Sequence, residues 1–132
     1  MNYWMVKSEP NSYSWEDFEK AGEDVWDGVR NYQARNYLKA MEVGDLVMFY
    51  HSGKEKAVVG IAQVTAAAFA DPKDEAWVAV NLRVAEKLAN PVTLTQIKAE
   101  DQLADLPMLK QSRLSVLPMS KGEFDWIKKM AQ

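Results

Sequence analysis

The sequence contains no cysteine and only one histidine, His51. Without thiols, a disulfide framework, a thiolate metal site and a cysteine nucleophile are all excluded. One histidine without paired carboxylates supplies too few ligands for metal catalysis. The six glycines are scattered singly, so no glycine loop is present to cradle a phosphate, and no Gly-x-Ser-x-Gly turn marks a serine nucleophile. We therefore expect no metal, no cofactor and no enzymatic activity.

Long apolar runs and flexible linkers are also missing. No segment approaches the roughly 20 apolar residues of a membrane helix. The N-terminal residues are not of signal-peptide type, because Tyr3–Lys7 has the pattern of a strand that stops at Pro10. No Pro/Gly/Ser-rich stretch divides the chain, and 48% hydrophobic residues with five tryptophans can fill a core. We expect one domain over residues 1–132, cytoplasmic, monomeric and without membrane contact.

The chain has no excess of positive charge, since 16 Lys and Arg face 19 Asp and Glu for a net charge of −3. A protein that binds nucleic acid mainly by neutralising phosphates needs a strongly basic face. The charges are nevertheless unevenly spread: acidic residues predominate between Glu9 and Asp27, and basic residues between Leu106 and Gln132. This composition permits a local basic rim but argues against a broad phosphate-binding surface.

Short strands and short helices are predicted along the chain. Apolar, aromatic and alternating patterns predict strands over Tyr3–Lys7, Leu46–His51, Val58–Val64, Val78–Val84 and Arg113–Leu117, the last ended by Pro118. Capping residues predict helices that begin after Ser14, Asn31, Thr93 and Ser120. Strands clustered in the middle favour an α+β domain on a curved, mostly antiparallel sheet. Closure into a small barrel would protect the edges of such strands.

One segment, Trp26–Asn36, concentrates planar and hydrogen-bonding side chains. It holds an indole, a carboxylate, guanidiniums, carboxamides and a phenol around Gly28. Such groups offer flat faces and polar edges, which are the means of gripping a nucleobase. An ordinary loop leading into a half-buried helix would explain the tyrosine and alanine, but it gives no reason for the polar residues.

Five sequence blocks follow one another along the chain. In order they are Tyr3–Pro10 (YWMVKSEP), Trp26–Asn36 (WDGVRNYQARN), Phe49–Ser52 (FYHS), Val59–Ala62 (VGIA) and Arg113–Val116 (RLSV). Together these blocks resemble the motifs of the EVE domain family. The resemblance implies a PUA-like fold, a curved β pseudobarrel flanked by short helices and related to YTH and ASCH domains. It also implies a pocket that receives a modified base, either modified cytosine in DNA or a modified base in RNA.

The resemblance has one clear departure. Members of the family often carry a longer insertion, with Pro and Tyr, where this chain has only Asp71–Trp77. Any partner contact that the insertion makes is therefore in doubt for this chain. The pocket motifs themselves are not affected.

Binding of an extruded base requires stacking surfaces, edge hydrogen bonds and a water-poor site. Trp26 is the best stacking candidate, with Tyr32 and Tyr50 as further walls, although a single aromatic residue is more often a core residue. Asp27 and Glu9 could accept hydrogen bonds from an exocyclic amine. Asn31 could bond a base or cap a helix. The predicted base pocket comprises Ser8, Glu9, Trp26, Asp27, Asn31, Tyr32, Tyr50, His51, Ser52 and Ser115.

Cations near these motifs are candidates for phosphate or sugar contacts, because a guanidinium binds phosphate in a bidentate way. The predicted set is Lys7, Arg30, Arg35 and Arg113. The leading hypothesis is a non-catalytic reader of a modified base in DNA or RNA. A small hydrolase or nuclease would require Asp27, Glu9 and His51 to converge on one substrate position. A protein-interaction domain would instead show an exposed apolar patch and no deep pocket.

Overall fold

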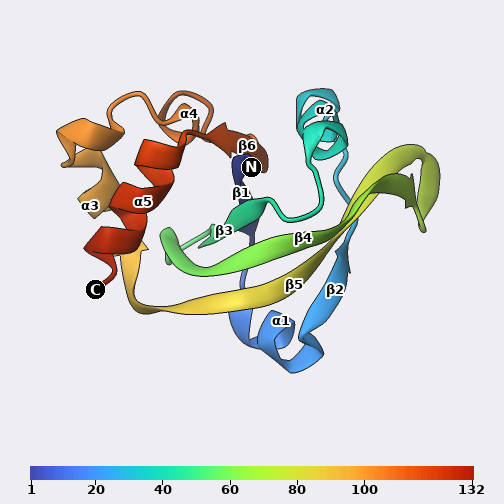
Figure 1. The fold of residues 1–132 in the computed structure, drawn as a ribbon, viewed down its shortest axis with the longest axis horizontal. Helices are drawn as coiled ribbons and strands as arrows, with labels where there is room; N and C mark the ends of the chain where they lie inside the picture. Colours follow the sequence, from blue (N-terminus) through green and yellow to red (C-terminus); the bar gives the residue numbers. More distant parts are fainter.

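A computed structural model describes residues 1–132. Figure 1 shows a sheet of long, bent strands with short helices placed around it. The strands are β1 (Tyr3–Ser8), β2 (Glu23–Trp26), β3 (Leu46–His51), β4 (Ala57–Asp71), β5 (Asp74–Thr93) and β6 (Val116–Met119). The helices are α1 (Trp15–Ala21), α2 (Tyr32–Ala40), α3 (Leu94–Lys98), the 3₁₀ turn η1 (Asp101–Leu103), α4 (Pro107–Lys110) and α5 (Lys121–Met130).

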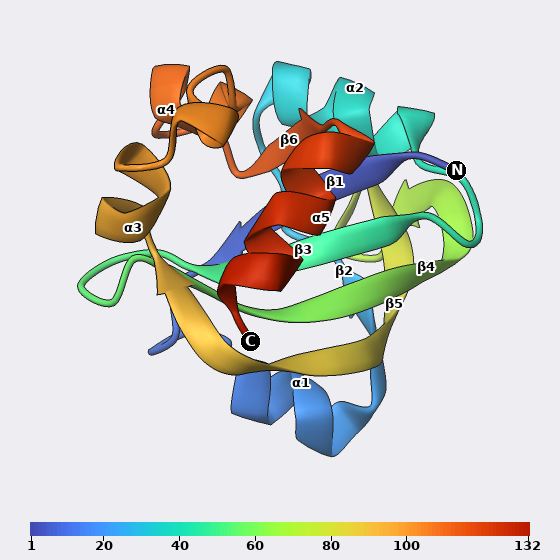
Figure 2. The same ribbon diagram turned by 60° about the vertical axis from the view of Figure 1, so that its left-hand side comes forward.

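The six strands form one mixed sheet in the order β2-β5-β4-β3-β1-β6. Only the β1–β3 pair is parallel, and the other neighbours are antiparallel. The sheet bends strongly, and α1 lies on the opposite side of it from α2, α4 and α5 (Figure 2). The α+β class and the curved, mostly antiparallel sheet with flanking helices are as predicted. The edge strands β2 and β6 do not pair with each other, so the sheet stays open and is not a closed barrel.

Local capping signals placed the helices correctly. Ser14, Thr93 and Ser120 each form a capping box with the side chain three residues later. The side chain of Asn31 accepts a hydrogen bond from the Ala34 N–H at 3.0 Å. These bonds satisfy backbone donors that a helix leaves unpaired at its first turn. They also fix the direction in which the chain enters each helix.

The strand boundaries needed several corrections. Strand β2 was not predicted, because it is an edge strand of four residues that are mostly acidic or exposed. Strands β4 and β5 extend far beyond the predicted ranges. The prediction stopped short because irregularities in their pairing interrupt the simple alternation of apolar and polar side chains. The last strand is Val116–Met119, whereas Arg113–Leu117 was predicted. Pro118 lies inside this strand rather than ending it, which is possible because β6 is an edge strand.

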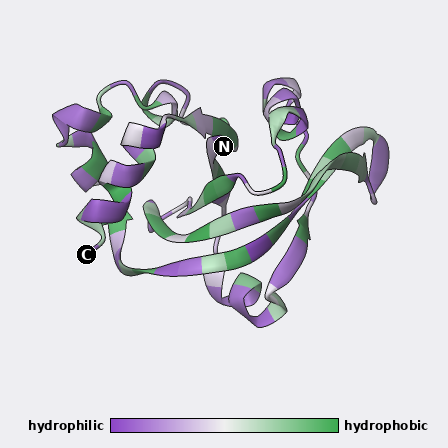
Figure 3. Ribbon diagram, in the orientation of Figure 1, coloured by the Kyte–Doolittle hydropathy of each residue, from purple (hydrophilic) through white to green (hydrophobic).

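The core is packed between the curved sheet and the helices. Hydrophobic residues gather along the central strands, whereas the tip of the β4–β5 hairpin is mostly hydrophilic (Figure 3). Trp15 and Phe18 of α1 pack on Phe49 of β3, with ring centroids 5.2 and 5.5 Å from Phe49. Trp26 contacts the same phenylalanine at 5.4 Å. This aromatic cluster joins the core to the end of β2. No helix is long and apolar enough to cross a membrane.

Candidate functional site

The largest cavity, about 570 Å³, lies where the end of β1, the strand β2 and the loop after β2 meet. It is bordered on one side by the tip of the β4–β5 hairpin. Its lining consists of Lys7, Ser8, Glu9, Ser12, Tyr13, Asp24, Val25, Trp26, Asp27, Gly28, Val29, Arg30, Lys73 and Ser115. This volume falls within the range of sites for small ligands, about 300–1,000 Å³.

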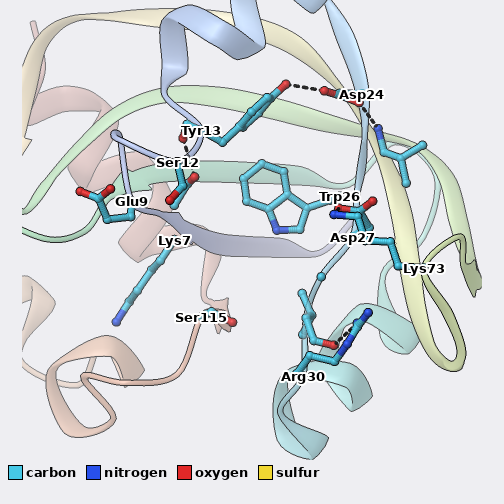
Figure 4. A pocket seen from close by; sticks show the side chains of 14 residues that line it. Lys7, Glu9, Ser12, Tyr13, Asp24, Trp26, Asp27, Arg30, Lys73 and Ser115 are labelled. Atoms are coloured by element: carbon cyan, nitrogen blue, oxygen red, sulfur yellow. Dashed lines mark hydrogen bonds and ion pairs between the residues drawn. The ribbon is translucent and has the colours of Figure 1, made fainter.

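Trp26 forms the flat wall of this cavity. Its side chain is held edge to face against Phe49 and against Tyr13, whose ring centroid is 6.1 Å away. Figure 4 shows the indole at the centre of the lining side chains, with its nitrogen toward Ser115 and Arg30. Only 9% of Trp26 is exposed. The indole is therefore fixed before any ligand binds, which limits the entropy lost on stacking.

Tyr13 and Asp24 close one side of the cavity. The Tyr13 hydroxyl donates a 2.6 Å hydrogen bond to Asp24 Oδ2. Burial and this carboxylate raise the pKa of Tyr13 well above its usual value of 10. The phenol therefore stays protonated in neutral solution and keeps the Asp24 carboxylate in place. Sequence reasoning missed both residues, because the pairing depends on β2, which was not predicted.

The loop after Trp26 is fastened to the β4–β5 hairpin by Asp71. Asp71 Oδ2 accepts hydrogen bonds from the Gly28 N–H at 2.9 Å and from Arg30 at 3.0 Å, and Oδ1 accepts one from the Lys73 N–H at 2.7 Å. Gly28 has φ +78°, a conformation that favours glycine. The shortened segment 71–77 thus supplies the anchor of the pocket loop, a role that the sequence did not reveal.

Asp71 is fully ionised in neutral solution. Burial alone would raise its pKa, but the hydrogen bonds from Arg30, Gly28 and Lys73 and the positive charge of Arg30 together lower the pKa from 3.8 to about 2. A carboxylate with a depressed folded-state pKa stabilises the fold above its unfolded pKa. That stabilisation is lost as the pH falls from about 4 toward 2.

The variant Asp71→Asn is expected to lower the free energy of unfolding by about 1–2 kcal/mol at pH 7, because charge-assisted hydrogen bonds are lost. Urea denaturation at several pH values checks this. The difference between wild type and variant should shrink between pH 4 and pH 2. Asp74→Asn is the control, since Asp74 is exposed and accepts only from the Ala76 N–H. A difference that does not change with pH in this window would argue against the role given to Asp71.

Charged groups of both signs surround the cavity mouth. The Lys73 Nζ atom lies 3.6 Å from Asp27 Oδ1, and the Glu9 carboxylate accepts a 2.8 Å hydrogen bond from the Asn11 N–H. The Ser8 hydroxyl donates to the Tyr13 carbonyl, so its oxygen remains free to accept. Lys7 donates to the Ser112 carbonyl at 2.9 Å, and burial lowers its pKa. The mouth therefore offers both donors and acceptors around one flat wall.

Comparison with known proteins identifies the family. The sequence profile described as the EVE domain matches residues 2–130. The chain belongs to the EVE domain family. Thymocyte nuclear protein 1 of Mus musculus is 32% identical over 96% of this chain and 72% of its own length. The predicted family membership is thereby confirmed.

Solved structures show the same fold. Rpa0253 from Rhodopseudomonas palustris is 41% identical, with a TM-score of 0.94 over 99% of this chain and 93% of its own. The human THYN1 protein is 27% identical, with a TM-score of 0.94 over 100% of this chain and 98% of its own. That human structure is a complex with DNA that contains 5-methylcytosine. The predicted PUA-like fold is confirmed by these matches.

In this EVE domain, the structure brings about half of the residues predicted for the site into one cavity. Those that line it are Lys7, Ser8, Glu9, Trp26, Asp27, Arg30 and Ser115. The remaining predicted residues do not line it, and they are Asn31, Tyr32, Arg35, Tyr50, His51, Ser52 and Arg113. Of these, Asn31 caps α2 and faces a separate hollow with Arg113, whereas Tyr50 and Ser52 face a groove on the far side of Lys7.

His51 is a buried link between β3 and α1. Its Nε2 accepts a 2.9 Å hydrogen bond from the Trp15 N–H, and its Nδ1 lies 2.9 Å from Glu55. Both ring nitrogens are thus engaged within the protein. Glu9 and Asp27 line a cavity that His51 does not reach, so the three groups do not converge as the hydrolase hypothesis requires. No three His, Asp or Glu side chains of the chain are placed to hold a metal ion.

Tyr32, Trp77 and two arginines form a cluster beside the cavity. The rings of Tyr32 and Trp77 stack with centroids 5.1 Å apart, and Tyr32 is 67% exposed. The Arg35 guanidinium lies 4.9 Å from the Tyr32 ring and 5.4 Å from the Trp77 ring. Arg30, which also lines the cavity, lies 5.7 Å from Trp77. The stacked rings therefore contact both guanidiniums, and Arg30 links this cluster to the cavity.

Proposed function

We propose that this EVE domain is a non-catalytic module that binds a nucleic acid by accepting one modified base in the cavity beside Trp26. The observation that carries the proposal is a rigid indole wall, with polar acceptors and donors at its rim, in a cavity of about 570 Å³. The complex of the human THYN1 protein with DNA that contains 5-methylcytosine supports it, because that protein shares the family and fold.

Within this proposal, each lining residue has a distinct role. Trp26 stacks on the face of the base, and Val29 adds apolar surface beside it. Asp27 and Glu9 are placed to accept from an exocyclic amine. The Ser8 and Ser115 hydroxyls bond the remaining polar edge. A cavity of mixed polarity suits one extruded base better than a length of strand.

The cations around the cavity are proposed to contact the sugar and phosphates next to the extruded base. Arg30 and Arg35 belong to the cluster with Tyr32 and Trp77, and Arg113 lies with Asn31 in a separate hollow. Tyr50, His51 and Ser52 do not line the cavity, so we propose that they support it from outside and do not contact the base. His51 and Tyr50 are buried within the sheet.

A binding screen tests the function. Wild type is titrated with short oligonucleotides that carry modified cytosines or modified adenines, in deoxy and ribo forms, and with unmodified strands. We expect at least tenfold tighter binding to one modification, the scale of a good base contact of about 1–3 kcal/mol. Unmodified strands should bind weakly, because the chain carries a net charge of −3, and their remaining phosphate contacts should make this binding sensitive to salt. Equal affinity for all strands would overturn the proposal.

The same samples address the enzymatic alternative. A non-catalytic reader leaves both the strand and the base unchanged after long incubation, whereas cleaved or altered products would favour a hydrolase.

We also propose that residues 1–132 form a single domain, that the protein is monomeric and that it is cytoplasmic. The relative from Mus musculus bears the name of a nuclear protein, so the location needs its own measurement.

A further inference from the structure

A second hollow, the lysine groove, begins on the far side of Lys7. It has a volume of about 290 Å³ and is lined by Lys7, Tyr50, Ser52, Gly53, Lys56, Leu94, Lys98, Met108 and Ser112. Lys7 is the only residue that lines both this groove and the base cavity. Figure 4 shows the Lys7 side chain extending away from Trp26, out of the base cavity. The two sites are therefore direct neighbours.

The groove carries an excess of positive charge. Three lysines line it and no acidic residue does. Lys7, Lys56 and Lys98 form no ion pair, although the chain as a whole has more acidic than basic residues. Two carboxylates lie at its edges: Glu55 is hydrogen-bonded to His51 Nδ1 and lines an adjoining hollow with Lys56 and Lys98, and Glu9 lies against Gly53. An unpaired cluster of this kind favours an anion.

The donors in the groove suit a phosphate. The Lys7 ammonium gives one hydrogen bond to the Ser112 carbonyl and lies 5.7 Å from the Tyr50 ring, which leaves further N–H groups free. Ser52 adds a hydroxyl donor beside the lysines. Lysine and serine side chains are common partners of nucleic-acid phosphates. Leu94 and Met108 supply apolar surface on which a sugar can rest.

We propose that the lysine groove binds the backbone phosphate adjacent to the base held in the cavity. The inference rests on the proposed function, because it takes the strand to be the one that delivers the modified base. Lys7 then touches both the extruded nucleotide and its neighbour. The adjoining hollow is lined by Lys54, Lys56 and Lys98 together with the single carboxylate of Glu55, so its charge stays positive on balance and gives the strand a path beyond the groove.

The test removes charge from the groove without touching the base cavity. The double variant Lys56→Gln, Lys98→Gln is compared with Lys20→Gln, Lys39→Gln, which loses the same charge from exposed positions that line neither site. The probes are a short single-stranded oligodeoxynucleotide with one 5-methylcytosine and its unmethylated twin. Affinities are measured by fluorescence anisotropy at several salt concentrations.

The groove variant should bind both probes about tenfold more weakly than the control at low salt, and its slope of log affinity against log salt should fall by about 1.4 for two lost contacts. The ratio of affinities for the two probes should not change, since the base cavity is intact. Equal affinities and equal salt slopes for the groove variant and the control would overturn the inference about the groove. The proposed function would still stand in that case if wild type prefers the methylated probe. If wild type prefers no modification in the screen, both fail.

Discussion

Replacing Trp26 by alanine is expected to weaken binding of the preferred modified strand by about 1–3 kcal/mol, the value of one base–aromatic stack. The modified and unmodified strands should then bind with nearly equal affinity. The reason is that Trp26 provides the flat wall of the cavity, and the other aromatic lining residue, Tyr13, meets it edge to face. Anisotropy titrations with matched modified and unmodified oligonucleotides measure the loss.

The alanine variant also loses core contacts, because Trp26 packs on Phe49. Loss of a large buried aromatic costs about 3–5 kcal/mol of stability, so circular dichroism must show that the variant is folded at the assay temperature. Trp26→Phe is the matched control: it keeps an aromatic face with a smaller surface, and should show an intermediate loss. A folded alanine variant with unchanged affinity and preference would contradict the account.

Gly60→Ala is expected to destabilise the protein by about 3 kcal/mol, the upper end of typical overpacking costs. A Cβ at Gly60 would lie 2.4 Å from the Trp15 ring, far inside any real contact. Trp15 is 2% exposed and is enclosed by Phe18 and Phe49, so it cannot swing aside. Phe49 in turn supports Trp26, and the strain should therefore reach the base cavity.

Chemical denaturation measures this effect, and Gly122→Ala is the control. A Cβ at Gly122 would have its nearest neighbour at 3.9 Å, and alanine is a better helix former than glycine. We expect Gly122→Ala to be neutral or slightly stabilising. Similar stability for the two variants would show that Trp15 does not fill the space above Gly60.

The features predicted correctly from the sequence are those that depend on residues close together along the chain. Helix starts at Ser14, Asn31 and Ser120 were placed correctly because their hydrogen bonds close within three residues. The central strand β3 was found because nearly all of its residues are buried and apolar. The edge strand β2 was missed because Glu23–Trp26 has no alternating apolar pattern. Only its pairing with the distant strand β5 makes it a strand.

Contacts between distant segments explain the gaps in the site. Asp71 holds Gly28 across 43 positions, and nothing near Asp71 in the sequence signals that bond. Residue type alone also does not show which aromatic side chains face the cavity. Tyr50 is buried in β3 and borders the lysine groove, whereas Tyr32 stacks on Trp77 at the surface. The direction of the Tyr50 ring is decided by the register of β3 in the sheet, and that of the Tyr32 ring by its contact with the distant Trp77.

In the proposed complex, one modified base stacks on Trp26. An NMR titration of the five tryptophan indole N–H signals with a 5-methylcytosine oligonucleotide detects this contact at the indole itself. The indole nitrogens of Trp15 and Trp126 are buried, so their signals serve as internal controls. If the base stacks on Trp26, the Trp26 signal should show a large, saturable shift, with little change in these two. A strand that binds to saturation while the Trp26 signal stays in place would contradict this stacking.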